Sequence, residues 1–257
     1  MRIVTHTCSN TEIVCALGAG AELVGVDNHS DYPAETVSSL PKIGPDLDID
    51  IAQIIALNPD LVITSLTVPG HEHCVEKIKK AGLPFLVTQP FSLRDVMADI
   101  VRIGEAIGRR TEAATLFSVF EERINRPIPH ETPLPVCIEW WPKPVIVPGQ
   151  QSWTNEMLRL AGAVNPFAGI PGESFELTPQ MACEASIEGI VISWCGVKES
   201  KYRPHIVARR PGWDDVPAIR NHHIFPISEA WLGRPGPRLL AGMDRLRQAI
   251  VTIRATK

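Results

Sequence analysis

The stretch Phe91–Asn125, FSLRDVMADIVRIGEAIGRRTEAATLFSVFEERIN, separates two halves of the chain that share one α/β pattern. Its apolar residues recur at helical spacing, at Val96, Ile100, Ile103, Ile107, Ala113, Leu116, Phe117, Phe120 and Ile124. Gly108 lies between the two apolar runs and is typical of a helix C-terminus. We therefore predict two helices: Ser92–Ile107, packed on the first half, and Thr111–Asn125, the long helix that connects the halves.

A proline-rich segment follows this pair of predicted helices. The sequence RPIPHETPLP contains four prolines, so neither a helix nor a central strand continues through it. We expect an N-terminal α/β lobe at 1–108, a connecting helix and linker at 109–135, and a C-terminal α/β lobe at 136–257.

Short apolar strands alternate with helices in both halves, which is typical of βαβ units and parallel sheets. In the first half we expect strands at 3–5, 23–26, 60–64 and 84–87, with helices at 10–17, 51–57 and 72–80. In the second half we expect strands at 136–139, 189–193 and 223–227, with helices at 154–160, 179–184 and 237–252. The predicted fold is therefore α/β, with two Rossmann-like lobes, parallel sheets, one long connecting helix and a ligand cleft between the lobes.

Two pairs of segments match between the halves in the same order. Asn10–Ile13 leads to Gly18, just as Thr154–Met157 leads to Gly162, and Asp60–Ile63 corresponds to Gly189–Ile192. A two-lobed chain explains both matches better than chance does.

Composition limits the possible functions. The net charge of −4 offers no basic surface, so we expect no nucleic-acid partner. No apolar run is long enough to cross a membrane as a helix. Met1 leads directly into a predicted strand without a signal peptide, so we expect a cytoplasmic protein if Met1 is the native start.

Aromatic residues gather in the second half. All six tryptophans lie there, and we place five of them on loops at strand ends: Trp140, Trp141, Trp153, Trp194 and Trp231. Tyr32 is the aromatic counterpart in the first half, and Arg234 lies in the proline-rich loop Arg234–Arg238. Ligands of parallel α/β sheets bind beyond the carboxyl ends of the strands, and flat side chains supply contact area for a planar ligand. A half-buried packing role is the common alternative for any single tryptophan.

Catalytic and metal-binding signatures are weak. The chain has no GxSxG motif, P-loop or HExxH motif, so we assign no catalytic residues and do not expect an enzyme. His71 and Cys74 share one face of a predicted helix, but a solvated helix start explains them equally well, and we assign no metal site. The six cysteines show no CxxC spacing, and we expect buried free thiols.

Several segments resemble the helical-backbone substrate-binding proteins of ABC importers, and among these the cobalamin-binding type. The segments are Ser9–Glu12 with Leu17-Gly18, Leu23–Val26 followed by Asp31-Tyr32-Pro33, Asn58–Ile63, Arg210–Trp213, Val216–Arg220, and Trp231 with Arg234–Arg238. The resemblance covers nearly the whole chain. It implies a non-enzymatic receptor, without a resident cofactor, that binds a corrinoid such as cobalamin and delivers it to a membrane permease.

The resemblance also implies roles for individual residues. Tyr32 and Trp231 would form aromatic walls for the ligand, and Asn10 belongs to the opening SNTE segment that marks the superfamily. Glu72 and Glu199 would dock the two lobes onto arginines of the permease. The family works in the periplasm or on the cell surface, and we expect a monomer.

One departure leaves the ligand open. Where the cobalamin-binding pattern has a tryptophan after its PDLVI strand, this chain has Ser65-Leu66. A receptor for haem, a ferric siderophore or a metal ion is therefore an alternative. A cytoplasmic corrinoid-handling protein or enzyme is another.

Overall fold

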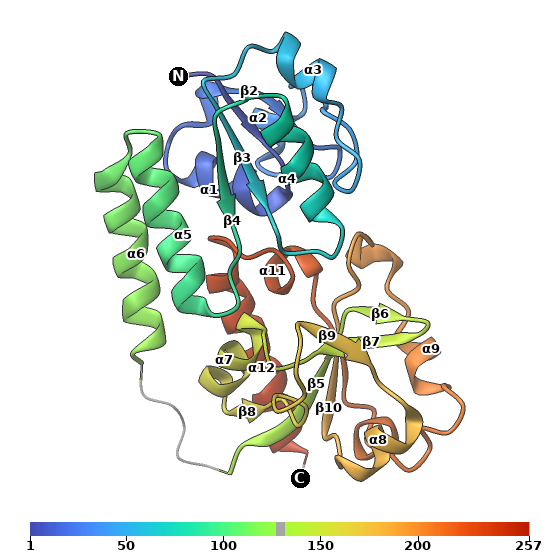
Figure 1. Cartoon of the computed structure of the whole chain (residues 1–257). Helices are drawn as coiled ribbons and strands as arrows, with labels where there is room; N and C mark the ends of the chain where they lie inside the picture. The colour runs from blue at the N-terminus through green and yellow to red at the C-terminus, as the bar shows by residue number, and fades with distance from the viewer. Residues whose placement is uncertain (127–131, 257) are drawn as a thin grey trace. The chain divides into compact units, whose positions relative to one another are not determined.

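The computed structural model describes residues 1–126 and 132–256, which form two compact units (Figure 1). The first unit contains Met1–Pro90 and Arg94–Glu121, and the second contains Phe91–Leu93 and the chain from Glu122 onward. Each unit has its own parallel β-sheet with helices packed on it. The prediction of two α/β lobes with parallel sheets is confirmed.

The first unit is built on a four-stranded sheet in the order β2-β1-β3-β4. Its strands are β1 (Ile3–Thr5), β2 (Leu23–Val26), β3 (Leu61–Ser65) and β4 (Phe85–Thr88), and every neighbouring pair is parallel. Ile3 pairs with Leu61, and Val62 pairs with Phe85. All residues of β1 and β3 are buried, as expected for parallel strands covered on both faces.

Short helices connect these strands. They are α1 (Cys8–Ala16), the 3₁₀ turn η1 (Gly20–Glu22), α2 (Ala34–Val37), α3 (Ile51–Ala56) and α4 (His71–Lys80). The Asp50 carboxylate accepts a hydrogen bond from the Gln53 N–H and so caps α3. Cys74 and Ile78 form the buried face of α4 and pack with Val4 and Val62 of the sheet.

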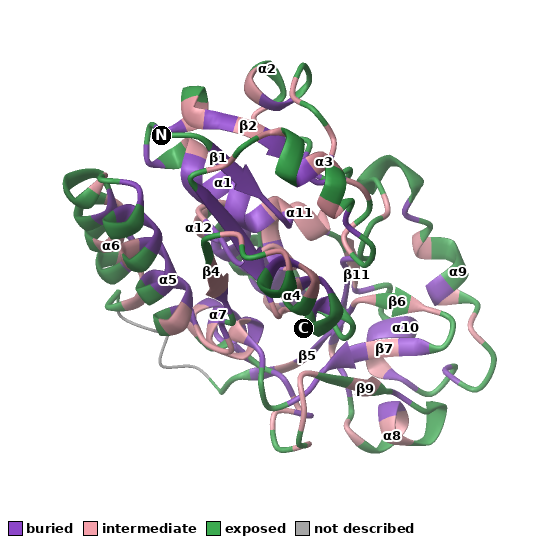
Figure 2. Ribbon diagram, turned by 45° about the horizontal axis from the view of Figure 1, so that its top comes forward, coloured by how far each residue is buried: buried purple, intermediate pink, exposed green. Residues whose placement is uncertain are grey.

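The stretch between the halves forms two helices, α5 (Leu93–Ala106) and α6 (Arg110–Ile124), as predicted. Gly108 between them has a φ of 70°, a left-handed conformation that favours glycine. A Cβ on Gly104 would lie 2.4 Å from Cβ of Ala113, so the two helices pack closely at this point. Figure 2 shows that most of α6 is exposed, and its buried residues are Ala113 and Phe120.

The second unit repeats the strand order of the first. Its parallel strands are β5 (Leu134–Glu139), β8 (Ala163–Val164), β10 (Gly189–Ile192) and β11 (Ile224–Pro226), in the order β8-β5-β10-β11. This matches β2-β1-β3-β4, with β5 in the place of β1 and β10 in the place of β3. The predicted correspondence of Asp60–Ile63 with Gly189–Ile192 is therefore confirmed.

A second, antiparallel sheet was not predicted from the sequence. It joins β6 (Trp141–Pro142), which we predicted to be part of a loop, with β7 (Val145–Pro148) and β9 (Ser174–Glu176), for which we predicted no element. The prolines in and around these strands indicate turns, and proline is tolerated in strands mainly at edges and ends. Strands of two to four residues also give too little alternation to recognise.

The remaining helices of the second unit are mostly short. They are α7 (Trp153–Ala161), α8 (Pro179–Glu184), η2 (Glu199–Lys201), α9 (Pro204–Ala208), α10 (Pro217–Arg220), α11 (Glu229–Leu232) and α12 (Leu239–Ala255). The last helix, predicted from about residue 237 to residue 252, is present as α12, which begins at Leu239 and ends at Ala255. Gly162 ends α7 in a left-handed conformation, with a φ of 87°, and Gly18 follows α1 with a φ of 73°. The predicted match of these helix ends is confirmed.

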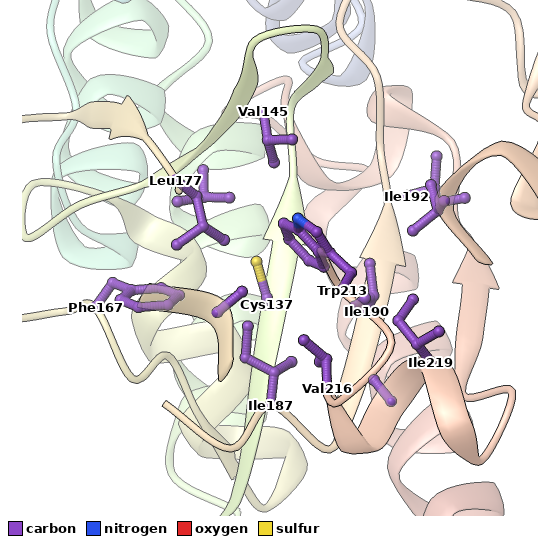
Figure 3. Packing of buried hydrophobic residues seen from close by; sticks show 14 of the residues in the cluster. Cys137, Val145, Phe167, Leu177, Ile187, Ile190, Ile192, Trp213, Val216 and Ile219 are labelled. Carbon is purple, nitrogen blue, oxygen red and sulfur yellow. The ribbon is translucent and has the colours of Figure 1, made fainter. Parts of the chain in front are cut away.

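The core of the second unit is centred on Trp213, which is 1% exposed. Figure 3 shows its indole lying beside Cys137 of β5 and Ile190 of β10. Val216 and Ile187 fill the space below the ring. A ring of this size, fully buried, is one of the larger single contributions to the stability of this unit.

Candidate functional site

Asn10 ties three elements of the first unit together. Its side-chain amide donates to the carbonyl oxygen of His6 at 2.9 Å, and its Oδ1 accepts from the Thr88 hydroxyl at 3.1 Å. The residue is 1% exposed. These bonds connect the ends of β1 and β4 to α1, so Asn10 has a structural role, and its predicted contact with a ligand stays a prediction.

A chain of buried hydroxyl groups continues from this point. Thr11 Oγ1 lies 2.7 Å from Thr5 Oγ1 and 2.8 Å from Ser30 Oγ. The Ser30 hydroxyl donates to Asp27 Oδ2 at 2.6 Å. The conspicuous SNTE segment therefore fixes the ends of β1 and β2 to α1.

Two buried histidines, His6 and His71, lie close to the Asp46 carboxylate near the start of α4. The rings of His6 and His71 meet edge to face, with centroids 4.8 Å apart, and His71 Nε2 lies 3.8 Å from Asp46 Oδ2. Burial lowers the pKa of His6, and the interaction with His71 lowers the pKa of the Asp46 carboxyl below its ordinary value. Among the described residues, neither ring nitrogen of His71 has a hydrogen-bond partner. His71 and Cys74 share a buried face of α4, yet the described residues include no group of three or more ligands placed to hold a metal ion.

The remaining predicted residues of the first unit are exposed. Tyr32 lies between β2 and α2 and is 47% exposed. Glu72 lies in the first turn of α4, where its Oε2 accepts from the Gly70 N–H at 2.8 Å. Backbone hydrogen bonds lower the pKa of Glu72, as expected for a carboxylate at a helix N-terminus.

A cavity of about 440 Å³ opens near the ends of β3 and β4 in the first unit. It is lined by Leu66, Val87, Gln89, Asp95, Ala98, Asp99 and Arg102. Asp99 is 5% exposed and accepts from Arg102 Nη1 at 2.8 Å, but its Oδ2 has no hydrogen-bond partner in the part of the chain that the structure describes. Burial raises the pKa of Asp99 from 3.8 to about 6.

In the second unit, Trp194 belongs to a buried ion-pair network that sequence reasoning missed. Glu139, 1% exposed, accepts two hydrogen bonds from Arg210 at 2.8 and 2.9 Å and a third from Trp194 Nε1 at 2.9 Å. The Arg210 guanidinium also lies over Trp213, 4.6 Å from the ring centroid. Trp194 is 5% exposed, so its predicted contact with a ligand stays a prediction. The sequence offered one signal for this network: the acidic residue Glu139 ends the otherwise apolar strand β5.

Trp153, Trp231 and Arg234 meet around the short helix α11. Trp231 lies in α11 and is half-buried, while Trp153 Nε1 donates to the carbonyl oxygen of Leu232 at 2.7 Å. Arg234 donates to Glu229 Oε1 from Nε at 3.1 Å and from Nη2 at 2.8 Å. The structure therefore brings Trp153 close to Trp231 and Arg234, which the sequence placed on a different loop.

Trp140 and Trp141 follow β5. Trp140 is half-buried, and its carbonyl oxygen accepts from the Cys195 N–H at 3.0 Å. Trp141 is 43% exposed, and its Nε1 donates to the Lys143 carbonyl oxygen at 3.1 Å.

The prediction that five tryptophans lie on loops is wrong for three. Trp141 lies in β6, Trp153 begins α7 and Trp231 lies in α11. These elements are only two to nine residues long, and the prolines and glycines around them hid their pattern.

The six cysteines are free, as predicted, but their burial differs. Cys74 and Cys137 are buried, whereas Cys195 is exposed. Glu199, the second docking candidate, is exposed in η2. Across the described residues, no helix is both long and apolar enough to cross a membrane.

Comparisons with known proteins place these observations in a family. A family model described as "Periplasmic binding protein" matches residues 3–230. The uncharacterized ABC transporter substrate-binding lipoprotein YvrC of Bacillus subtilis is 30% identical, with 97% of this chain and 79% of YvrC covered. A vitamin B12-binding protein of Vibrio vulnificus is 26% identical, with 98% and 90% covered.

Solved structures agree. The periplasmic haem-binding protein RhuT from Roseiflexus sp. RS-1, in its apo form, has a TM-score of 0.81 and 28% identity, with 100% of this chain and 99% of RhuT covered. The two-lobed fold and these matches together identify the chain as a member of the periplasmic binding protein family and an ABC-type substrate-binding protein.

Proposed function

We propose that this protein binds a corrinoid such as cobalamin, using aromatic residues from both units, and delivers it to the permease of an ABC importer. The observation that carries the proposal is Trp231, a half-buried indole on a helix fixed by surrounding residues, in a chain of this family. Relatives named as vitamin B12-binding proteins, similar along 98% of this chain, support the choice of ligand.

Tyr32 is the proposed aromatic contact in the first unit. Nearly half of its surface is exposed, so a ligand can contact the ring without disturbing a core. Trp140, Trp141, Trp153 and Arg234 are proposed as further contacts. We assign Asn10 and Trp194 structural roles within their own units, because both are buried and hydrogen-bonded there.

Fluorescence titration tests the ligand. Cyanocobalamin added at micromolar concentration should quench tryptophan emission, and Trp231→Leu and Tyr32→Ala should each weaken binding about tenfold or more. Val119→Ala, at an equally exposed apolar residue of α6, is the control for Tyr32→Ala and should bind normally. Absence of quenching by cyanocobalamin would reject a corrinoid as the ligand.

Haem is the second candidate ligand, and one specific observation favours it. The haem-binding protein RhuT is similar over the full length of this chain at 28% identity. Titration with hemin and with a ferric hydroxamate, under the same conditions as cyanocobalamin, would rank the three ligands by affinity. Tighter binding of hemin than of cyanocobalamin would reassign the substrate to haem.

Glu72 and Glu199 are proposed to dock the protein onto arginines of the permease. Both carboxylates lie in exposed first turns, one in each unit, where a partner can reach them. Glu72→Ala and Glu199→Ala should leave the ligand affinity unchanged but weaken binding to permease-containing nanodiscs, more strongly at low salt. Glu112→Ala, at an exposed carboxylate of α6, is the control. Normal nanodisc binding by the double variant would overturn this docking role.

We also propose that the protein acts as a monomer in the periplasm or on the cell surface. Membership of the periplasmic binding protein family and the lipoprotein among its relatives support this location. Fractionation of cells producing the full-length native gene product, with detection of any lipid anchor by mass spectrometry, tests it. Recovery of all the protein with cytoplasmic markers would contradict the proposed location.

A further inference from the structure

The helix that carries Trp231 is too short to hold its own position. α11 contains four residues, Glu229–Leu232, and an isolated helix of that length is unstable in water. Its place must therefore be fixed by contacts with other elements. The structure shows such contacts at both of its ends and on the Trp231 ring.

The first turn of α11 is held by Tyr202 and Arg234. The Tyr202 hydroxyl accepts from the Glu229 N–H at 3.1 Å and donates to the Trp194 carbonyl oxygen at 3.1 Å. The Glu229 carboxylate pairs with Arg234, and their side chains are only 13% and 11% exposed. The start of α11 is thus linked to the loop after β10.

The last turn is held by α7 and α12. Trp153 at the start of α7 donates its indole N–H to the Leu232 carbonyl oxygen at 2.7 Å. On the other side, a Cβ added to Gly242 of α12 would lie 2.0 Å from the Trp231 carbonyl oxygen and 3.0 Å from its carbonyl carbon. Because these are backbone atoms, no side-chain rotation relieves such a clash.

This close approach explains why a glycine lies within α12. Glycine within a helix is less favourable than alanine. The close approach of the α11 backbone requires the missing side chain, and Gly242 itself is buried.

Arg245, one turn further along α12, contacts the Trp231 ring itself. Its Cζ lies 4.3 Å from the centroid of the Trp231 ring, which is a cation–π contact. Residues three apart share a face of a helix, so α12 contacts the Trp231 backbone through Gly242 and its ring through Arg245. One face of the indole is therefore covered by Arg245, and a ligand can stack only on the other.

We propose that Gly242 and Arg245 are positioning residues that fix the plane of the Trp231 indole for stacking against a flat conjugated ligand. The proposal rests on the proposed ligand contact of Trp231. The guanidinium on one face also weakens the attraction of the opposite face for a second cation. The part of the ligand that stacks on Trp231 is therefore neutral or anionic.

Fluorine NMR of protein labelled with 5-fluorotryptophan tests, in the absence of ligand, whether Arg245 and Gly242 fix the position of the Trp231 ring. The spectrum contains one resonance for each of the six tryptophans, and Trp231→Phe assigns that of Trp231. Arg245→Met keeps an unbranched stem but removes the cation, and it should shift or broaden the Trp231 resonance while leaving that of Trp213 in place. Arg247→Met, at an exposed arginine of the same helix, is the matched control and should change neither resonance.

Cyanocobalamin titration of the same variants tests the consequence for binding. Arg245→Met should weaken binding by about twofold to fivefold, the range of one exposed cation–π contact, and Arg247→Met should not. Gly242→Ala should displace the Trp231 resonance further and weaken binding more. A cationic porphyrin, used as a second probe, should gain affinity relative to cyanocobalamin in Arg245→Met.

The outcomes separate the two proposals. If Trp231→Phe and Trp231→Leu bind cyanocobalamin normally, the ligand contact of Trp231 is wrong. If these variants lose affinity while Arg245→Met keeps both the normal Trp231 resonance and normal affinity, only the positioning role is wrong. A shifted resonance with unchanged affinity would likewise overturn the positioning role.

Discussion

The two units share one strand order but differ in the polar groups at the ends of their strands. In the first unit, the ends of β1 and β2 are joined by the hydroxyls of Thr5, Thr11 and Ser30, and Ser30 donates to the buried Asp27 carboxylate. In the second unit, the end of β5 is an ion pair between Glu139 and Arg210, surrounded by indole rings. The shared strand order thus places polar groups at strand ends in both units. The type of side chain determines how much each group contributes to the free energy of unfolding.

The ion pair of the second unit should give the largest effect. Arg210→Met leaves the Glu139 carboxylate unpaired at 1% exposure, and breaking a buried pair in this way costs about 3–5 kcal/mol. Urea denaturation followed by near-ultraviolet circular dichroism, which reports on tryptophan packing in the second unit, measures the loss. Arg209→Met, at the exposed neighbouring arginine, is the control and should change stability little.

The double variant Glu139→Gln/Arg210→Met separates charge from packing. Without the buried charge, stability should return partway towards that of the wild type, because the glutamine can still accept from Trp194 Nε1. Equal losses in Arg210→Met and in the double variant would assign the effect to lost packing over Trp213.

Asp99 of the first unit is a buried carboxyl group whose ionised form opposes folding. The Asp99 pKa is raised to about 6 from 3.8, so its stabilising contribution is fully present below pH 3.8 and is lost as the pH rises through 6. Asp99→Asn removes this penalty while keeping an acceptor for Arg102. It should therefore stabilise the protein by about 3 kcal/mol above pH 7, with little gain near pH 3.5.

Denaturation of wild type and Asp99→Asn at several values of pH measures this difference. Glu112→Gln, at an exposed carboxylate of α6, is the control and should not reproduce the pH dependence. A stability difference that stays constant from pH 4 to pH 8 would refute the raised pKa.

The helices and the two-unit repeat could be predicted from the sequence because their patterns are long or occur twice. Val96, Ile100 and Ile103 recur at helical spacing, and all three are fully buried in α5. The Gly18 and Gly162 helix ends identified the repeat, and the structure confirms it in the strand order. The β6-β7-β9 sheet was missed because its strands are short and rich in proline.

The candidate site was less predictable because it depends on partners distant in sequence. The tryptophans of the second half drew attention to Trp153 and Trp231. Nothing in the local sequence indicated that Trp153 donates to the backbone of α11, or that Arg245 of α12 lies over the Trp231 ring. Arg210 lies 71 residues from Glu139, and no periodic pattern connects them. For Trp194 and Asn10, the residue type indicated function, whereas their hydrogen bonds within each unit explain their presence.

The smallest expected effect compares two matched positions of the repeat. Thr11 in α1 corresponds to Asn155 in α7 when Glu12 is aligned with Glu156. Thr11→Val removes a buried hydroxyl that contacts Thr5 and Ser30, which should cost about 1–2 kcal/mol.

Asn155 is half-buried and can exchange its partners for water more easily. Its amide donates to the Gly149 carbonyl oxygen at 2.9 Å and its Oδ1 accepts from Asn165 at 2.8 Å, so Asn155→Ala should cost about 1 kcal/mol or less. Urea denaturation of both variants measures the difference. A larger loss for Asn155→Ala than for Thr11→Val would mean that burial of the hydrogen-bonded group is not what distinguishes the two units at this position.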